Sequence, residues 1–363
     1  MTGRGAAGGL RAARSARGWS QSQAARELAE LARSSGAPVA GAASLKTLLS
    51  RWENGHALPE PQYRSLLGEL YGRTPEELGI AGPPADPEAA GAAGRLRSAL
   101  AAAAAVDGAA LALWREQLDV AVRLDDELGT TGAGEVVRAL VERLHDTALH
   151  ALTPAGRAGV EAVLAPAAVL AGAQELDRGR PDLAWQRYQR ARAAALEAER
   201  ADVAGDAYAG LATVLLDVHE PAAAEALLQA AEAELPGPAR ARLAGARAAT
   251  AAALGDASEA RRAIATADVA TAAVPVELAD LDRWHGHALA VLGHPGAVQP
   301  LRRALAAPPR SVRHLAAVHA DLALALAAEH PEDAAGHART ARELAERIGS
   351  TRTQERLAAL RLS

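Results

Sequence analysis

The amino-acid sequence predicts an all-α fold, and three observations lead to that prediction. Half of the 363 residues are apolar, dominated by Ala, Leu and Val, and there is no Phe. Ala and Leu are strong helix formers, and no long stretch of alternating β-branched residues appears. Turns rich in Gly and Pro interrupt the Ala/Leu-rich segments at fairly even intervals, as expected for successive helices.

The composition bears on the cellular compartment in which the protein is expected. The absence of cysteine excludes disulfides and thiol chemistry and is compatible with a reducing compartment. Residues 1–9 lack the apolar segment of a signal peptide. No run of 18 or more apolar residues is free of charge, and residues 99–105 are too few to cross a bilayer. We therefore expect a cytoplasmic protein without a membrane span.

Charge is distributed unevenly along the chain, whose net charge is −5. Residues 1–82 carry nine Arg and one Lys against seven Glu, a balance of +3, so the remainder carries −8. The positive charge lies in the small N-terminal part, where contact with nucleic acid would need it.

A Pro/Gly-rich segment, residues 83–94, predicts a linker between two domains. The predicted domains are residues 1–82 and residues 95–363. In the first, the pattern predicts five short helices, at 8–17, 21–33, 44–53, 60–71 and 75–79. The second begins with helices at 107–128 and 133–150, which we interpret as the cap of a helical array.

The larger domain contains five similar turns, each between two Ala/Leu-rich helices. Taking Gly179, Glu220, Gly255, Gly293 and Pro331 as markers, the successive spacings are 41, 35, 38 and 38 residues. Gly or Asp-Pro ends one helix and starts the next, while Ala allows paired helices to approach closely. The spacing is similar to that of tetratricopeptide repeats, about 34 residues. The sequence therefore predicts a tetratricopeptide-like solenoid of helical hairpins.

The N-terminal domain carries the most specific motif. Residues 10–25 read LRAARSARGWSQSQAA, residues 44–59 read SLKTLLSRWENGHALP, and residues 74–78 read TPEEL. Together they resemble the Xre, or lambda-repressor-like, helix-turn-helix family over about 70 residues. Gly18 is placed to end the first helix and Ser20 to cap the second. Leu49 and Trp52 share one face of the third helix, which Gly55 ends.

The resemblance implies which residues contact DNA. It places Lys46, Thr47, Ser50 and Arg51 on the face of the third helix that reads base edges in the major groove. Lys and Arg donate to guanine O6 and N7, and Thr and Ser contact several bases. Lys46 is the only lysine, against 38 arginines.

Four further positions match the family pattern. Gln21 matches a residue that contacts a phosphate and braces the third helix, and Asn54 matches one whose backbone approaches a phosphate. Arg14 and Glu53 match an internal ion pair, so we assign them to structure. A small helical bundle that binds protein is the alternative for this domain.

The chain departs from the family in one place. Residues 34–43 form a ten-residue loop, whereas the usual turn has about 3–4 residues. Leu48 then occupies a position that the family often gives to a polar base-reading residue. It either contacts a thymine methyl group or packs on the long loop, and we favour packing.

The chain as a whole also resembles Xre regulators of the actinobacterial type with a tetratricopeptide-like C-terminal domain. The matching segments are residues 124–129 (LDDELG), 175–180 (ELDRGR) and 348–352 (IGSTR). These motifs support the architecture and say nothing about a ligand.

Candidate ligand-binding residues lie in the solenoid. Trp185, Tyr188 and Arg192 share one helical face, and aromatic and polar groups of neighbouring repeats, Tyr208, Trp284 and His287, add to them. They either line a concave groove for a peptide or small molecule or pack between helices, and we favour packing.

Other chemistry is not indicated. His285 and His287 point to different sides of a helix rather than at one ion, and no His pair with supporting carboxylates stands out. The sequence has no Gly-rich phosphate loop, nucleophile elbow or defined carboxylate pair. We expect no metal, no cofactor and no catalysis.

The sequence therefore predicts a homodimeric, sequence-specific transcriptional regulator that binds a double-stranded DNA operator. Residues 1–82 would bind the DNA. The solenoid, residues 95–363, would mediate dimerisation and sense a peptide, small molecule or protein. The alternative is a protein-interaction scaffold that does not bind DNA and uses the groove of the helical repeats.

Overall fold

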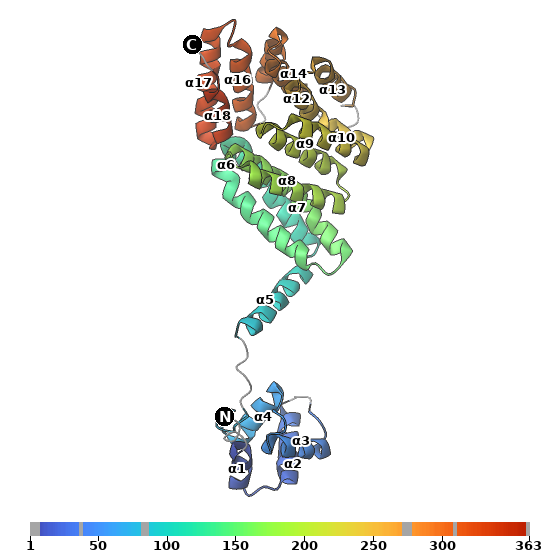
Figure 1. Cartoon of the computed structure of the whole chain (residues 1–363), viewed down its shortest axis with the longest axis vertical. Coiled ribbons are helices and arrows are strands. Elements are labelled where there is room, and N and C mark those ends of the chain that lie inside the picture. The colour runs from blue at the N-terminus through green and yellow to red at the C-terminus, as the bar shows by residue number, and fades with distance from the viewer. Residues whose placement is uncertain (1–7, 36–38, 81–86, 271–277, 308–310, 361–363) are drawn as a thin grey trace. The chain divides into compact units, whose positions relative to one another are not determined.

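The computed structural model describes residues 8–35, 39–80, 87–270, 278–307 and 311–360 (Figure 1). Throughout these ranges the chain forms helices joined by short connections, and no strand occurs in them. The predicted all-α class is therefore confirmed.

Tertiary contacts divide the chain into two compact units, residues 1–97 and residues 98–363. The boundary falls inside helix α5 (Pro87–Ala104). The linker expected at 83–94 is therefore helical from Pro87 onward, and its earlier residues lie outside the described part. Pro is tolerated in the first turn of a helix. Ala-rich flanking sequence outweighs Gly91 and Gly94, each of which costs only about 1 kcal/mol in a helix.

In the first unit, four of the five expected helices are present. They are α1 (Gly8–Ala16), α2 (Gln21–Ser34), α3 (Ala42–Glu53) and α4 (Pro61–Tyr71).

The fifth, expected at 75–79, is wrong, because these residues form a hydrogen-bonded turn. Leu78 N donates to Thr74 O at 3.0 Å and Ile80 N to Pro75 O at 2.9 Å. Gly79, with φ of 65°, ends the turn after a single coil. The turn buries Leu78 and Ile80 in the core of this unit.

After α5, the second unit continues with α6 (Gly108–His150), which consists of two helices joined at a kink, as expected. The break between the two is present as a kink at Gly129, whose φ is 63° and ψ −158°. Glycine adopts this backbone conformation without the steric cost that a Cβ imposes.

Five helical hairpins follow, and all five predicted turns lie between the paired helices. The pairs are α7 (Pro154–Asp177) with α8 (Pro181–Glu197), α9 (Ala201–Asp217) with α10 (Pro221–Glu234), α12 (Ala244–Ala253) with α13 (Ala257–Ala270), α14 (Leu278–Val291) with α15 (Val298–Ala306), and α16 (Val312–Leu326) with α17 (Pro331–Ile348). Short helical segments, α11 (Gly237–Arg240), η1 (Ala241–Leu243) and η2 (Pro295–Ala297), occupy connections, and α18 (Thr351–Ala358) is the last helix.

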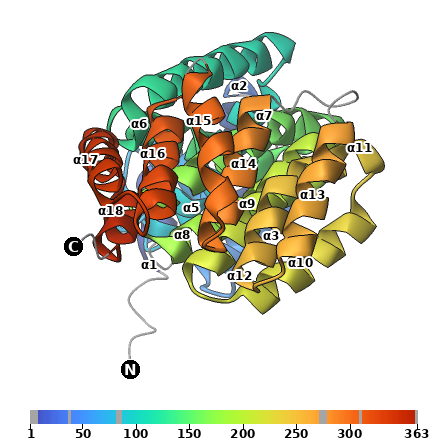
Figure 2. The ribbon, with the colours of Figure 1, turned by 90° about the horizontal axis from the view of Figure 1, so that it is seen from above.

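The first helices of the hairpins contact one another in sequence order: α7, α9, α12, α14, α16 and then α18. The view from above shows α16 between α14 and α17 (Figure 2). The series then closes, because α18 contacts α7 while α16 and α17 contact α6. In a simple solenoid each repeat contacts only its neighbours. Here the contacts between the ends of the series are added to those between neighbouring hairpins.

Ion pairs and a hydroxyl group connect the helices where the series closes. Arg313 on α16 donates to Asp125 of α6 at 2.5 Å and to Asp177 of α7 at 2.5 Å. Ser350 Oγ, just before α18, donates to Asp177 Oδ1 at 3.3 Å. Asp125, Asp177 and Ser350 belong to the three short motifs LDDELG, ELDRGR and IGSTR, so segments far apart in the sequence meet at one place.

Among the described helices, α7 alone is long and apolar enough to cross a bilayer. The bent pair α5 and α6 would be a second candidate if the two helices were counted as one span. Half of the apolar window of α7 is buried, and the helix packs between α6 and α8. Core helices of soluble proteins meet the same criterion, so this is weak evidence for a span.

Candidate nucleic-acid interface

The second and third helices are fixed to each other by their ends and their apolar faces. Ser20 caps α2 by accepting from Gln23 N, and the Gln23 side chain accepts from Ser20 N in return, so the predicted cap is confirmed. Leu45, Leu49 and Trp52 bury one face of α3. The opposite face is left to solvent.

A buried carboxylate anchors the end of α3. Glu53 is 2 % exposed and accepts from Arg14 Nε at 2.6 Å, Arg14 Nη2 at 3.0 Å and Gln21 Nε2 at 2.9 Å. The expected Arg14–Glu53 ion pair is therefore present. Burial would raise the pKa of Glu53, but these hydrogen bonds lower it below its usual value. The hydrogen bond to Glu53 likewise raises the pKa of Arg14.

The predicted base-reading residues share the outer face of α3. Lys46, Thr47 and Arg51 are exposed and Ser50 is half-buried. Within the described residues, the side chains of Lys46 and Arg51 form no hydrogen bond or ion pair. The helix thus presents two uncompensated cations with hydroxyl groups between them, which is a surface suited to hydrogen-bond acceptors.

Gln21 and Asn54 have structural partners of their own. The amide of Gln21 braces α3 through Glu53, as expected. Asn54 follows the last residue of α3, and its Nδ2 donates to Ser50 O at 2.7 Å. Their expected contacts with phosphates remain predictions.

The long connection before α3 is held by a contact that sequence reasoning missed. Ala40 N donates to the hydroxyl of Tyr63, on α4, at 3.1 Å. Leu48 is half-buried against the core of the unit, together with Val39 and Ala40 of the connection. The favoured interpretation of Leu48 as a packing residue is consistent with this position. No sequence motif signals the Tyr63 contact.

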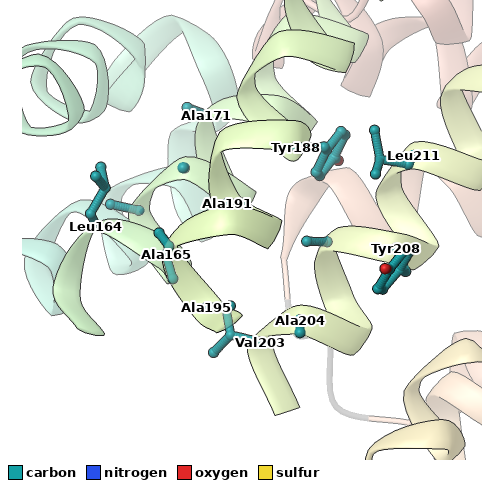
Figure 3. Packing of buried hydrophobic residues seen from close by; sticks show 14 of the residues in the cluster. Leu164, Ala165, Ala171, Tyr188, Ala191, Ala195, Val203, Ala204, Tyr208 and Leu211 are labelled. Carbon is teal, nitrogen blue, oxygen red and sulfur yellow. The ribbon is translucent and has the colours of Figure 1, made fainter. Parts of the chain in front are cut away.

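The six candidate ligand residues do not gather at one site. Tyr188 and Tyr208 are buried in the core of the second unit (Figure 3). The Tyr188 ring lies where a Cβ at Gly172 or Gly210 would clash, so these glycines of α7 and α9 make room for it. Arg192 stacks over the ring of Tyr208 at 5.4 Å, and Trp185 is half-buried against the same core.

The other two candidates lie elsewhere. Trp284 packs on Gly245 of α12. His287 Nδ1 is 2.9 Å from Asp321 Oδ1, which also accepts from Arg356 at 2.7 Å. Burial would raise the pKa of Asp321, yet His287 and Arg356 hold it well below its usual range. These contacts are those of packing and internal ion pairing.

Comparisons with known proteins identified no relative: no family model, no curated protein and no solved structure matches the chain. Over the described ranges, no group of three or more His, Cys, Asp or Glu side chains is placed to hold a metal ion.

Proposed function

We propose that the chain is a sequence-specific, DNA-binding transcriptional regulator of the Xre type. The observation that carries the proposal is the outer face of α3. There Lys46, Thr47, Ser50 and Arg51 project from a helix whose other face is fixed by the core and by Glu53. A rigid helix that presents cationic and hydroxyl side chains on its exposed side has the form that major-groove recognition requires.

A second copy would complete the DNA-binding form. One helix-turn-helix covers few base pairs, and two-fold pairing is the usual route to specificity. Leu113, Val120 and Leu128 of α6 are 64 %, 46 % and 44 % exposed and recur at seven and eight residues on one side of the helix. Exposed apolar side chains in a row mark an interaction surface. We assign this surface to a homodimer.

The scaffold alternative draws on the same apolar row of α6, since it fits another protein as readily as a second copy. The two functions differ in their response to salt. Neutralising phosphates releases counterions, so the affinity for duplex DNA falls steeply as the salt concentration rises.

The test is an affinity measurement on the full chain with duplexes selected from a random pool, at salt concentrations from low to physiological. A regulator selects a shared sequence and shows a steep salt slope for it. A scaffold selects no sequence and leaves the duplex unbound at physiological salt.

A further inference from the structure

Helix α18 lies against α7, α16 and α17 but buries few of its own side chains. Of its eight residues, only Thr353 and Leu357 are buried. Leu357, together with the partly buried Leu360 after the helix, packs on alanines of α16 and α17. Most of the stability of a protein helix comes from the packing of its apolar face, so α18 is held only weakly by this kind of contact.

Ion pairs supply most of the remaining contact. Arg352 donates to both carboxylate oxygens of Asp217, the last residue of α9, at 2.5 and 2.8 Å. Four residues further along, Arg356 donates to Asp321 of α16 at 2.7 Å. The side chains of the two arginines are 32 % and 31 % exposed, so water and salt reach both pairs. Salt screens such pairs, and the attachment of α18 should therefore weaken as the salt concentration rises.

The surface that receives α18 is built by other helices. It consists of the carboxylates of Asp217 and Asp321 with the alanine cluster beside them, and we call it the α18 site. His287 of α14 also lies 2.9 Å from Asp321. Asp321 is 1 % exposed, and a buried carboxylate is costly to leave without a cation. The α18 site therefore favours an occupant that carries arginines at the places of Arg352 and Arg356.

The connection before α18 allows the helix to leave as a unit. Gly349 ends α17 with φ of 71°, and only Gly349 and Ser350 separate the two helices. A few residues at the end of an element commonly serve as a hinge. Rotation there would free α18 without unwinding α17.

We propose that the α18 site is a docking surface for a helical segment of another protein, and that α18 is its internal occupant. The segment presents two arginines four residues apart with a leucine directly after the second, as Arg352, Arg356 and Leu357 do. Exchange replaces one pair of arginines by another, so no buried carboxylate loses its cation. Docking itself does not depend on DNA. Only its role as a signal to the regulator rests on the proposed function.

The experiment measures docking by fluorescence anisotropy, with the full chain and a labelled peptide that has the sequence of residues 350–360. In the parent, the peptide competes with α18, whose tether gives it a high effective concentration. In the variant Arg352→Gln/Arg356→Gln, the α18 site is intact but its internal occupant has lost both ion pairs. The peptide should bind this variant about 2- to 30-fold more tightly than the parent, the range expected for two accessible pairs. Absence of binding to the variant would overturn the proposal.

The matched control is Arg339→Gln/Arg342→Gln, which removes two exposed cations from α17 and leaves α18 unchanged. This chain should bind the peptide like the parent. A second peptide, with the same composition but with its two arginines adjacent, should bind none of the three chains. Tighter binding to both double variants, or equal binding of the two peptides, would indicate diffuse attraction and overturn the proposal.

Asp217→Asn, added to Arg352→Gln/Arg356→Gln, places the site. Asn keeps the size of a side chain that is 25 % exposed and removes its charge. Affinity for the peptide should fall by about 2- to 5-fold relative to the double variant, the contribution of one accessible pair. An unchanged affinity would mean that the peptide binds elsewhere, which contradicts the assignment.

Hydrogen exchange of the parent tests the release of α18 without any substitution. The amides of α18 should exchange through local opening, faster than those of α16, and faster still as the salt concentration rises. Equal exchange of α18 and α16 at every salt concentration would mean that α18 leaves only when the unit unfolds. That result would overturn the proposal even if the variants did not fold.

Light scattering with the peptide present identifies the other possible occupant. If the peptide converts a dimer of the parent into monomers, α18 of a second copy fills the site and the proposed partner is wrong. If the peptide fails to bind but the salt-dependent affinity for DNA persists, this inference falls alone. If DNA binding fails and the peptide docks as expected, only the proposed function falls.

Discussion

Arg313 and Asp177 are 136 residues apart in the sequence, yet Arg313 Nε donates to Asp177 Oδ2 at 2.5 Å. Asp177 also accepts from Thr130 Oγ1 at 3.2 Å and from Ser350 Oγ at 3.3 Å. One carboxylate therefore joins α6, α7, α16 and the start of α18. This closed arrangement makes the hairpins depend on one another across the unit, in addition to their contacts with sequence neighbours.

Breaking the closure should destabilise the second unit strongly. Arg313→Ala leaves Asp125 and Asp177, which are 1 % and 4 % exposed, without their cation. Removing one partner of a buried ion pair costs about 3–5 kcal/mol. Thermal unfolding should show this loss, and small-angle scattering should show a larger radius of gyration where the variant remains folded.

The matched control for the closure is Arg303→Ala. Arg303 pairs with Asp282 at 2.6 Å, but its side chain is 59 % exposed. Surface ion pairs contribute about 0–1 kcal/mol, so this variant should unfold nearly like the parent. Equal losses in the two variants would mean that the closing contact adds no stability of its own.

The sequence predicted most of the helices and all five hairpin turns, but it did not predict this closure. Hairpin turns were predictable because Gly179, Gly255 and Gly293 adopt positive φ, which few other residues accept. The sequence contains the LDDELG, ELDRGR and IGSTR motifs, but nothing in a single sequence indicates that Asp125, Asp177 and Ser350 meet. Periodicity reports which face of a helix is buried, and it does not report which distant helix covers that face.

On the outer face of α3, the proposed function predicts that Lys46→Ala and Arg51→Ala each weaken specific DNA binding by about 1–3 kcal/mol, the contribution of a good bidentate base contact. Both side chains are exposed, so the Tm should stay unchanged. Affinity is measured by fluorescence anisotropy on the selected duplex. Arg73→Ala, which removes an exposed cation beyond α4, is the control for charge. If it weakens binding as much, Lys46 and Arg51 contribute only general electrostatic attraction.

The stabilisation that Glu53 provides at the end of α3 should depend on pH. The folded-state pKa of Glu53 lies below its ordinary value of 4.5, so Glu53 stabilises the fold above that value. This stabilisation is lost as the pH falls through the lowered pKa. In Glu53→Gln, the first unit should lose stability at neutral pH, because Arg14 is left without its carboxylate. It should also become less sensitive to pH below 4.5. Urea unfolding at several pH values checks both effects.

The sequence predicted which residues lie on the buried and exposed faces of α3. It predicted only some of the contacts that hold α3 in place. Helical spacing predicts that Leu49 and Trp52 share one face of α3. The resemblance to the helix-turn-helix family predicts the Arg14–Glu53 pair. Neither predicts the Tyr63–Ala40 contact, because it depends on the path of a connection whose length is unusual. For Tyr188 the sequence favoured packing but left a groove open, because it does not show that Gly172 and Gly210 leave room for the ring.

A histidine pair should make the last hairpin sensitive to mild acid. His319 Nδ1 and His337 Nδ1 are 2.9 Å apart, so two protonated rings would repel each other. Burial lowers the pKa of His319, and the charge of His337 adds to this effect; burial also lowers the pKa of His337, although Asp333 opposes it.

Because the folded-state pKa values lie below 6.5, the unfolded chain binds more protons as the pH falls through that value. The Tm should therefore decrease from pH 7.5 to 5.5, and less so in His319→Gln. His145 and His285, whose pKa values are also lowered by burial, account for a residual slope. His330→Gln, at the exposed start of α17, should keep the parent slope. A slope that survives unchanged in His319→Gln would contradict the assignment.

The row of apolar side chains on α6 should determine the oligomeric state. Val120→Glu places a charge in the middle of the row formed by Leu113, Val120 and Leu128, and burying an unpaired carboxylate in an apolar interface is strongly unfavourable. We expect light scattering to give a dimer for the parent and a monomer for this variant at micromolar concentration. Leu196→Glu, an exposed site on α8, should remain dimeric. If the proposed function holds, each monomer presents one α3 to DNA, so Val120→Glu should also bind the selected duplex more weakly while its Tm stays near that of the parent. A parent that is monomeric both free and on DNA would exclude pairing through α6.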